Sequence, residues 1–333
     1  MRSRVSAGVD RFLDVRNQSD AEIAQLSRDL EIDIAIDLKG FTKEGRPGIF
    51  ACRAAPIQAS YLGYPATMAM DSIDYLIADA TVVPESARRH YTEKIVTLPH
   101  SYQVNDAQRV ISSAPCSRAA EGLPEQAFVF CCFNASWKIL PGTFAAWMRL
   151  LAELPGGVLW LLEDNPWVAA NLRAQAVRHG IAPERLVFAP RRSQAEHLAR
   201  HRLADLVLDT LPYNAHTTAS DALWTGLPVL TCMGQSFAGR VSASLLRAIH
   251  LPELIATTPA EYFALALALA RDPARLGAIR AKLARNRLTT PLFDTPGFAR
   301  DLEAAYTAML ARYDASLPPD HIHIAPRQSA ELK

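Results

Sequence analysis

The sequence predicts an α/β fold made of two lobes, each built on a parallel sheet. Short runs rich in Val, Ile, Leu and Phe alternate with longer segments of helical spacing, which is the pattern of βαβ units. Most of these runs are continuously apolar, as in strands that helices cover on both faces. A chain of 333 residues also has room for about two domains.

The expected elements follow this alternation along the chain. Strands of the first lobe are expected at 33–38, 57–63, 74–79 and 93–99, and those of the second at 127–134, 157–163, 185–190, 203–209 and 228–233. Helices are expected at about 20–30, 143–153, 166–179, 194–202, 217–226, 239–249, 259–271, 273–287 and 296–313, many with Gly, Pro, Asp or Thr at an end.

The lobes are separated by a segment without apolar periodicity. Residues 106–126 are polar and contain two prolines and one glycine, so we predict a linker there. It joins a first lobe at 1–105 to a second at 127–295, followed by a C-terminal helix at 296–316 and a tail at 317–333 that we expect to be a loose extension. Because the first lobe has only four strand candidates, we expect it to be incomplete.

Composition excludes several function classes. Lys and Arg number 35 against 34 Asp and Glu, so no basic footprint for nucleic acid or anionic membrane exists. No apolar run of about 18 residues and no signal-peptide core is present, and we expect a cytoplasmic protein. Five cysteines without CxxC spacing predict neither a disulfide scaffold nor a zinc site, and Cys131 and Cys132 are expected to be buried.

Residues 206–230 carry the strongest local signal. A buried strand ends near Asp209, a polar turn follows, and a helix is expected to begin at His216, Thr217 and Thr218. A helix start beyond the carboxyl end of a parallel strand binds phosphate through free N–H groups. Asp221, one turn later, suits ribose hydroxyls. The alternative is that Thr217 caps the helix and Asp221 complements its dipole.

Lys138 is a second candidate, because it follows the strand at 127–134 in a loop before a helix signalled by Pro141. Its ammonium could reach the same crevice, although a solvated loop lysine would have the same pattern. His197 and His216 are equally consistent with packed or exposed side chains.

No two aspartates are separated by one residue, so no metal is expected on a diphosphate. The tail's His321 and His323 are too few for a closed metal site.

The turn after the strand at 57–63 is a third candidate. Leu62, Gly63 and Pro65 lie there, and a glycine at a strand end allows close approach of a ligand. A plain tight turn uses the same residues.

Several long motifs resemble one family. They are DLKGFTK (37–43), RAAPIQASYLGYPAT (53–67), DYLIAD (74–79), EKIVTLPHSY (93–102), FNASWKILP (133–141), LPYNAHTTASDALWTGLPVLT (211–231), GRVSASLL (239–246) and PLFDT (291–295). Taken in order over nearly the whole chain, they resemble the catalytic region of the O-linked N-acetylglucosamine transferase and SPINDLY family, the family 41 glycosyltransferases.

The resemblance implies two Rossmann-like lobes of the GT-B type and a metal-independent, inverting transfer of N-acetylglucosamine from UDP to Ser or Thr of a protein. It implies no cofactor beyond the UDP-N-acetylglucosamine donor. Lys138 and His216 correspond to catalytic residues, of which Lys138 neutralises the departing diphosphate. The resemblance also implies residues that contact the donor, at the wall of the sugar pocket, the base, the phosphates and the ribose. These residues are Leu62, Gly63, Pro65, Asn134, Gln194, His197, Thr217, Thr218 and Asp221.

The chain also departs from the family pattern. Ala135 and Gln194 replace a glutamine and a lysine near the nucleotide, and Tyr213 replaces a smaller cysteine of the N-acetyl pocket. His216 favours the N-acetylglucosamine branch over a fucosyltransferase. The family's upstream His-Pro-Thr motif and its tetratricopeptide repeats are not found in these residues, so we expect the repeats on a longer polypeptide. A non-catalytic nucleotide-sugar-binding module and a transferase of another sugar, such as fucose, remain alternatives.

Overall fold

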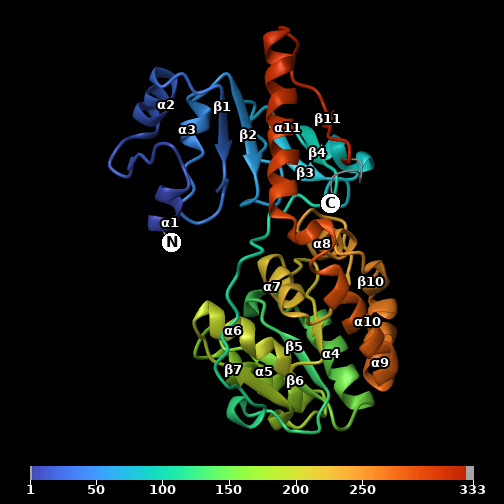
Figure 1. Cartoon of the computed structure of the whole chain (residues 1–333). Coiled ribbons are helices and arrows are strands. Elements are labelled where there is room, and N and C mark those ends of the chain that lie inside the picture. Colours follow the sequence, from blue (N-terminus) through green and yellow to red (C-terminus); the bar gives the residue numbers. More distant parts are fainter. Residues whose placement is uncertain (1, 328–333) are drawn as a thin grey trace. The chain divides into compact units, whose positions relative to one another are not determined.

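The computed structural model describes residues 2–327 and divides into two compact units. Unit 1 contains residues up to 77, 88–96 and 305–322, and unit 2 contains 78–87, 97–304 and the residues from 323 onward. The division falls earlier than the predicted linker, because 97–126 pack with unit 2, and the end of the C-terminal helix packs with unit 1 (Figure 1). Each unit is described by itself below.

The sheet of unit 1 has the strand order β1-β2-β3-β4-β11. Parallel pairing joins Ile34 to Ile57 and Ala59 to Tyr75. Its strands are β1 (Ile34–Asp37), β2 (Ile57–Tyr61), β3 (Tyr75–Asp79), β4 (Lys94–Leu98) and β11 (Ile322–His323), and its helices are α1 (Arg2–Ala7), α2 (Asp20–Asp29), α3 (Gly48–Ala51) and the end of α11 (Thr295–Asp314). The start of α2 carries a capping box between Ser19 and Glu22, which satisfies two N–H groups of the helix end.

Unit 2 is a doubly wound α/β domain. Its sheet has the order β10-β9-β8-β5-β6-β7, and neighbouring strands pair in parallel. The strands are β5 (Val129–Cys132), β6 (Val158–Leu162), β7 (Leu186–Ala189), β8 (Leu206–Leu208), β9 (Val229–Cys232) and β10 (Ile255–Ala256). The helices between and after them are α4 (Pro141–Glu153), α5 (Val168–Arg178), α6 (Gln194–Arg200), α7 (Thr217–Thr225), α8 (Val241–Ala248), α9 (Pro259–Arg271) and α10 (Pro273–Asn286).

This order is that of dinucleotide-binding sheets. Numbered from β5, the six strands run 3-2-1-4-5-6, and the chain reverses direction across the sheet between β5 and β8. Phe130 of β5 pairs with Leu206 of β8 at this reversal. In such folds ligands bind beyond the carboxyl ends of the two central strands, because the loops after them turn away in opposite directions.

The core of unit 2 explains the continuous apolar runs. Cys131, Cys132, Leu159 and Trp160 are buried within β5 and β6, since helices cover both faces of a parallel sheet. The prediction that both cysteines are buried is confirmed. Burial also raises the pKa of both thiols, that of Cys132 to about 12, so neither forms a reactive thiolate at neutral pH.

All predicted strands and helices are present, with ends displaced by only a few residues. The sequence did not predict α1, α3, β10 or β11. The prediction of a loose tail is wrong for its described part, because β11 joins the sheet of unit 1. His321 accepts a hydrogen bond at its Nδ1 from the backbone N–H of Ile95, and Arg327 forms an ion pair with Asp301. Residues 328–333 lie outside the described part.

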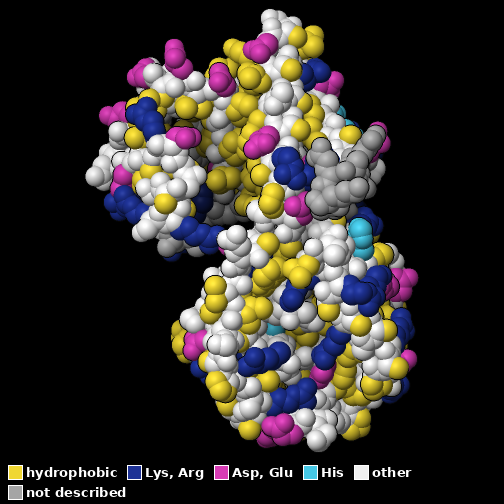
Figure 2. All heavy atoms as spheres, viewed as in Figure 1, with side chains coloured by type: hydrophobic (Ala, Val, Ile, Leu, Met, Phe, Trp, Pro, Cys, Tyr) yellow, Lys and Arg dark blue, Asp and Glu magenta, His cyan; other side chains and the backbone are white. Residues whose placement is uncertain are grey.

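The surface agrees with the charge balance. On the face drawn in Figure 2, basic and acidic side chains are interspersed with apolar and uncharged ones. Within residues 2–327, no helix is both long and apolar enough to cross a membrane.

Candidate functional site

The candidate site of unit 2 lies where its topology directs a ligand, at the carboxyl ends of β5 and β8. The segment after β5 contains a short 3-10 helix, Ser136–Lys138, and the segment after β8 leads into α7. We call residues 209–216, between β8 and α7, the switch loop. The polar residues that the sequence singled out in unit 2 lie in these two segments and on α6 and α7.

Asp209 fixes the switch loop through hydrogen bonds to its carboxylate. Its buried carboxylate accepts hydrogen bonds from the backbone N–H of Thr210 at 2.7 Å and of Ala215 at 2.6 Å, and from the hydroxyl of Thr231 on β9 at 2.7 Å. Burial raises the pKa of Asp209, and these hydrogen bonds lower it. A single carboxylate thus fixes both ends of the loop.

Asn134, at the end of β5, connects the switch loop to α7. Its amide Nδ2 donates to Oγ1 of Thr210 at 2.8 Å, and its Oδ1 accepts from the hydroxyl of Thr218 at 2.6 Å. Asn134 is buried, and each of these groups has a partner, as buried polar groups require. The predicted residues Asn134 and Thr218 are therefore brought together, although 84 positions separate them.

Lys138 reaches the same loop, as predicted. Its Nζ donates to the backbone carbonyl of Asn214 at 2.8 Å and lies 4.2 Å from the ring centroid of Tyr213. An ammonium over an aromatic face is attracted by the ring quadrupole. Burial lowers the pKa of Lys138, and the nearby Asp209 raises it. The ammonium has three N–H donors, and the protein partner occupies one of them.

His216 lies at the end of the switch loop and is uncharged at neutral pH. Its ring stacks on Tyr213 with centroids 4.9 Å apart, and its Nε2 lies 3.3 Å from the carbonyl oxygen of Ala238. Burial, and then the charge of Lys138, lower the pKa of His216 to about 4. Because a carbonyl only accepts, Nε2 carries the proton in this arrangement.

The N–H groups at the start of α7 are not capped by a side chain. His216 is the N-cap residue, and no side chain caps the helix. Its carbonyl accepts from the N–H groups of Ala219 and Ser220, while Thr217 is exposed. Uncapped N–H groups at the positive end of a helix dipole are suited to an anion. The alternative interpretation of Thr217 as the N-cap is wrong, because His216 takes that position.

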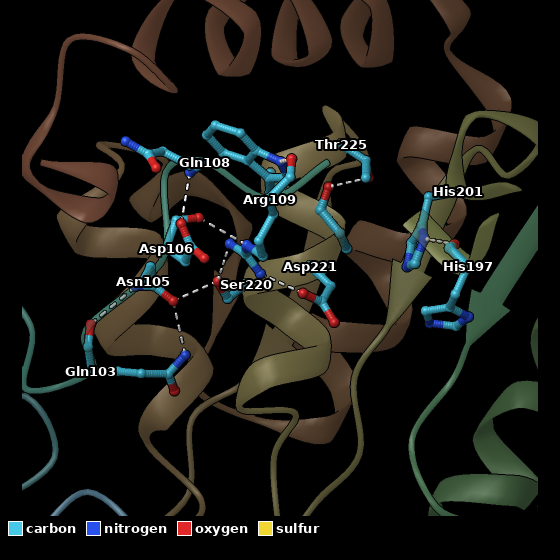
Figure 3. A network of polar contacts seen from close by, with 12 residues as sticks. Gln103, Asn105, Asp106, Gln108, Arg109, His197, His201, Ser220, Asp221 and Thr225 are labelled. Atoms are coloured by element: carbon cyan, nitrogen blue, oxygen red, sulfur yellow. Dashed lines mark hydrogen bonds and ion pairs between the residues drawn. The ribbon is translucent and has the colours of Figure 1, made fainter. Parts of the chain in front are cut away.

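Asp221 has a partner that the sequence did not indicate. Its Oδ1 accepts from Nη1 of Arg109, and Nη2 of Arg109 donates to the hydroxyl of Ser220 at 2.9 Å. Figure 3 shows Arg109 and Asp221 pointing toward one another. Asp221 therefore does not act only on the helix dipole, as the alternative had it. Arg109 lies within the predicted linker, where polarity gave no sign of a buried cation.

His197 is on α6, with its ring 5.0 Å from Phe133 and 4.9 Å from His201. Its Nδ1 lies 2.6 Å from Nη2 of Arg200, and since a guanidinium only donates, Nδ1 accepts and the proton is on Nε2. Burial lowers the pKa of His197 to about 3 and that of His201 to about 4. His197 thus carries one N–H available to a ligand. Gln194 begins α6 and is exposed.

The three predicted residues of unit 1 form the turn after β2. Leu62 has a left-handed φ of 69°, and a Cβ at Gly63 would lie 2.0 Å from the carbonyl oxygen of Leu38. The chain's own backbone therefore requires glycine at this position. Pro65 follows two residues later and is partly exposed.

No metal cluster is present among the described residues. Within 2–327, no group of three or more His, Cys, Asp and Glu side chains is arranged to hold a metal ion. That the reaction needs no metal stays a prediction.

Comparisons with known proteins agree on one family. The sequence model described as Glycosyl transferase family 41 matches residues 1–114 and 108–302. A probable UDP-N-acetylglucosamine–peptide N-acetylglucosaminyltransferase, SEC, of Arabidopsis thaliana is 36% identical over 329 residues, covering 97% of this chain and 34% of that protein. The corresponding transferase of Caenorhabditis elegans is 29% identical over 402 residues, covering 87% of this chain and 35% of that protein.

A solved structure is similar over nearly the whole chain. A mutant of the Thermobaculum terrenum O-GlcNAc transferase superimposes with a TM-score of 0.87 at 34% identity, covering 94% of this chain and 60% of that one. The predicted α/β fold of the GT-B type is thereby confirmed. The chain spans about a third of the length of the two curated relatives.

Proposed function

We propose, since the chain belongs to glycosyl transferase family 41, that it transfers N-acetylglucosamine from UDP-N-acetylglucosamine to a Ser or Thr hydroxyl of a protein. The observation that carries this proposal is the switch loop. An uncapped helix start and a partly buried lysine lie beside this loop, at the crossover of the doubly wound sheet. The chain thus contributes at least the donor-binding part of such an enzyme.

The diphosphate is proposed to bind at the start of α7. The N–H groups of Thr217 and Thr218 and the hydroxyl of Thr217 face an anion there, while the hydroxyl of Thr218 donates to Asn134. The helix dipole also favours negative charge. His216 serves as the first residue of this helix start and adds no charge. The two remaining N–H donors of Lys138 are directed to the phosphate that leaves.

The nucleoside is proposed to extend from the diphosphate toward α6. Asp221 accepts hydrogen bonds from ribose hydroxyls, and the Nε2–H of His197 donates to a carbonyl of the base. Gln194 lies near the base, and Asn134 orients Thr218 through the hydrogen bond at 2.6 Å. In unit 1, Leu62, Gly63 and Pro65 are proposed to form the wall of the sugar pocket.

The reaction is proposed to be a direct displacement with inversion. The acceptor hydroxyl oxygen forms a bond to the anomeric carbon while the bond from that carbon to the UDP oxygen breaks, and the hydroxyl proton is released. Negative charge therefore grows on the departing diphosphate. Fixed donors aimed at this charge, namely Lys138 and the start of α7, stabilise the transition state without a metal.

A second candidate is binding without transfer. It is favoured by one observation: the chain spans only about a third of its curated relatives, so residues needed for turnover could lie elsewhere in a longer polypeptide. A different donor sugar is a variant of the first proposal, because the Tyr213 ring is larger than the cysteine of the family pattern. The protein acceptor is proposed only at the level of its hydroxyl group.

Calorimetry with UDP and UDP-N-acetylglucosamine tests the shared premise. We expect both ligands to bind with micromolar affinity and uridine alone to bind far more weakly, since the phosphate contacts are the densest part of the site. No binding of UDP at high micromolar concentration would contradict both candidates.

A radiolabel assay then separates the two candidates. Transfer of labelled N-acetylglucosamine to a protein acceptor supports the enzyme, while tight donor binding without transfer supports the binding module. UDP-glucose and GDP-fucose as alternative donors test the identity of the sugar.

A further inference from the structure

Arg109 is a firmly held cation of unit 2 that no predicted role uses. Its side chain is 8% exposed, although arginine is rarely buried. Nε donates to the carbonyl of Asp106 at 3.0 Å and Nη2 to the hydroxyl of Ser220 at 2.9 Å. The guanidinium also lies 5.7 Å and 5.6 Å from the ring centroids of Trp224 and Phe293.

These contacts come from independent parts of the chain. Ser220 in turn donates to Oδ1 of Asn105 at 2.5 Å, and the indole N–H of Trp224 donates to the carbonyl of Arg109 at 3.1 Å. Figure 3 shows Asn105 and Arg109 both linked to Ser220. A guanidinium fixed by a fork of hydrogen bonds and by two rings has little freedom to move when a ligand arrives.

A third N–H group of the guanidinium is directed at Asp221. Nη1 of Arg109 donates to Oδ1, and no protein donor among residues 2–327 reaches Oδ2. Oδ2 has no hydrogen-bond partner among these residues, and it is not fully buried. It therefore keeps some contact with solvent. One oxygen of the carboxylate is therefore held by the protein and the other is open.

We infer that Arg109 is a positioning residue that fixes Oδ1 of Asp221 and thereby presents Oδ2 to the ribose hydroxyls of a nucleoside diphosphate. This inference rests on the proposed function. In this inference Arg109 does not touch the ligand itself, since its side chain is only 8% exposed and Nε, Nη1 and Nη2 each donate to a protein acceptor.

Electrostatics point the same way. Burial raises the pKa of Asp221, and the charge and hydrogen bond of Arg109 lower it. Removing the guanidinium would leave a buried carboxylate without its counter-ion, which favours its protonated form. A protonated carboxyl group is a weaker acceptor for a ribose hydroxyl. Arg109 thus maintains both the orientation and the charge of Asp221.

The test uses deoxy analogues to isolate the ribose contact. Affinities of the full chain for UDP, 2′-deoxy-UDP and 3′-deoxy-UDP are measured by calorimetry for the wild type, Asp221→Asn and Arg109→Lys. The wild type should prefer UDP over at least one analogue by about tenfold, the effect of one hydrogen bond to a charged group. Both variants should reduce this preference to within about threefold while their affinity for that analogue stays within about threefold of wild type.

Arg287 supplies a matched control. Its guanidinium also lies over Trp224, at 5.4 Å, and Nη1 donates to the carbonyl of Trp224, but it makes no hydrogen bond to Asp221. Arg287→Lys should keep the wild-type preference for UDP. A change that acts through general loosening of this region would lower the preference in both arginine variants.

Several outcomes would overturn the inference. If Arg109→Lys keeps the preference while Asp221→Asn loses it, the inference fails and the proposed function stands. If Arg109→Lys weakens UDP and the analogues equally, Arg109 is structural only. If wild type binds no UDP, the proposed function itself fails.

A milder variant covers the case in which Arg109→Lys does not fold. Ser220→Ala removes one hydrogen bond of the guanidinium and leaves the ion pair in place. It should lower the preference for UDP by about two- to threefold, a partial loss for one neutral hydrogen bond. An unchanged preference would then count against the inference.

Discussion

Replacing Lys138 by alanine should reduce sugar transfer far more than it weakens UDP binding. The ammonium is already held in the free protein, by the Asn214 carbonyl at 2.8 Å and the Tyr213 ring at 4.2 Å. Part of its desolvation is therefore complete before the donor arrives. Such a preorganised donor acts most strongly where charge develops during the reaction.

The size of the effect follows from these contacts. Removing one preorganised donor from a developing oxyanion costs about 2.7–4 kcal/mol, which corresponds to a loss in kcat of roughly a hundred- to a thousandfold. In the ground state of the Lys138→Ala variant, the diphosphate keeps its contacts with the start of α7, which supplies most of the proposed phosphate donors. We therefore expect UDP affinity to fall by less than about tenfold, or about 1.4 kcal/mol.

Two measurements on the same preparations check this prediction. Transfer of radiolabelled sugar at saturating donor gives kcat, and calorimetry gives the Kd of UDP. Lys282→Ala is the matched control, since Lys282 lies in the same unit and pairs with Glu253 at 2.7 Å on the surface. It should leave both quantities unchanged. Equal losses of affinity and of kcat in Lys138→Ala would refute the transition-state role and identify a binding lysine.

Three further predictions concern the local structure. Thr218→Val removes the hydrogen bond to Asn134. It should lower the free energy of unfolding in urea by about 1 kcal/mol and weaken UDP binding severalfold in calorimetry. If neither quantity changed, the proposed role of Thr218 in the site would be contradicted. Ser19→Ala removes the capping box of α2 and should also cost about 1 kcal/mol, and an unshifted urea midpoint would show that this cap contributes nothing. Acid should destabilise the fold, because burial lowers the pKa of His201 and of His216 to about 4, from the ordinary histidine value of about 6.5. Between these two values the unfolded chain binds more protons than the folded chain, so this contribution to stability is present above pH 6.5 and is lost as pH falls toward 4. The loss is about 2 kcal/mol per histidine at about pH 5. The His216→Gln variant should lose less stability than wild type between about pH 7 and 5, and equal losses would exclude His216 as a cause.

The sequence predicted those parts of the site whose signals are contiguous. The strand ending near Asp209, the polar turn and the helix start at Thr217 follow one another directly, so each constrains the next. Lys138 could be placed because it stands between a buried strand and a helix that begins at Pro141. The parallel topology then brings these two segments to one edge of the sheet.

Other features depend on contacts between distant positions. Arg109 and Asp221 are separated by 112 residues, and the segment around Arg109 is polar without periodicity, which is also the pattern of a linker. Its charge is buried because a carboxylate and two rings meet it, and no local pattern carries that information. β10 and β11 contain two residues each, too few for any alternation to be recognised.

The charge balance of the site makes Lys138 important for neutralising a bound diphosphate. His216 and His197 are uncharged at neutral pH, and Asp209 lies buried beneath the loop. Among residues 2–327, Lys138 is the cation whose side chain is hydrogen-bonded to the switch loop. Under the proposed function, a bound diphosphate is therefore only partly neutralised, which suits the release of UDP after transfer. In the proposed reaction, charge that appears during bond cleavage meets the same lysine and the same helix start, so we expect their contribution to grow as the bond breaks. A net charge of +1 over the chain is compatible with this chemistry, because the compensation is local.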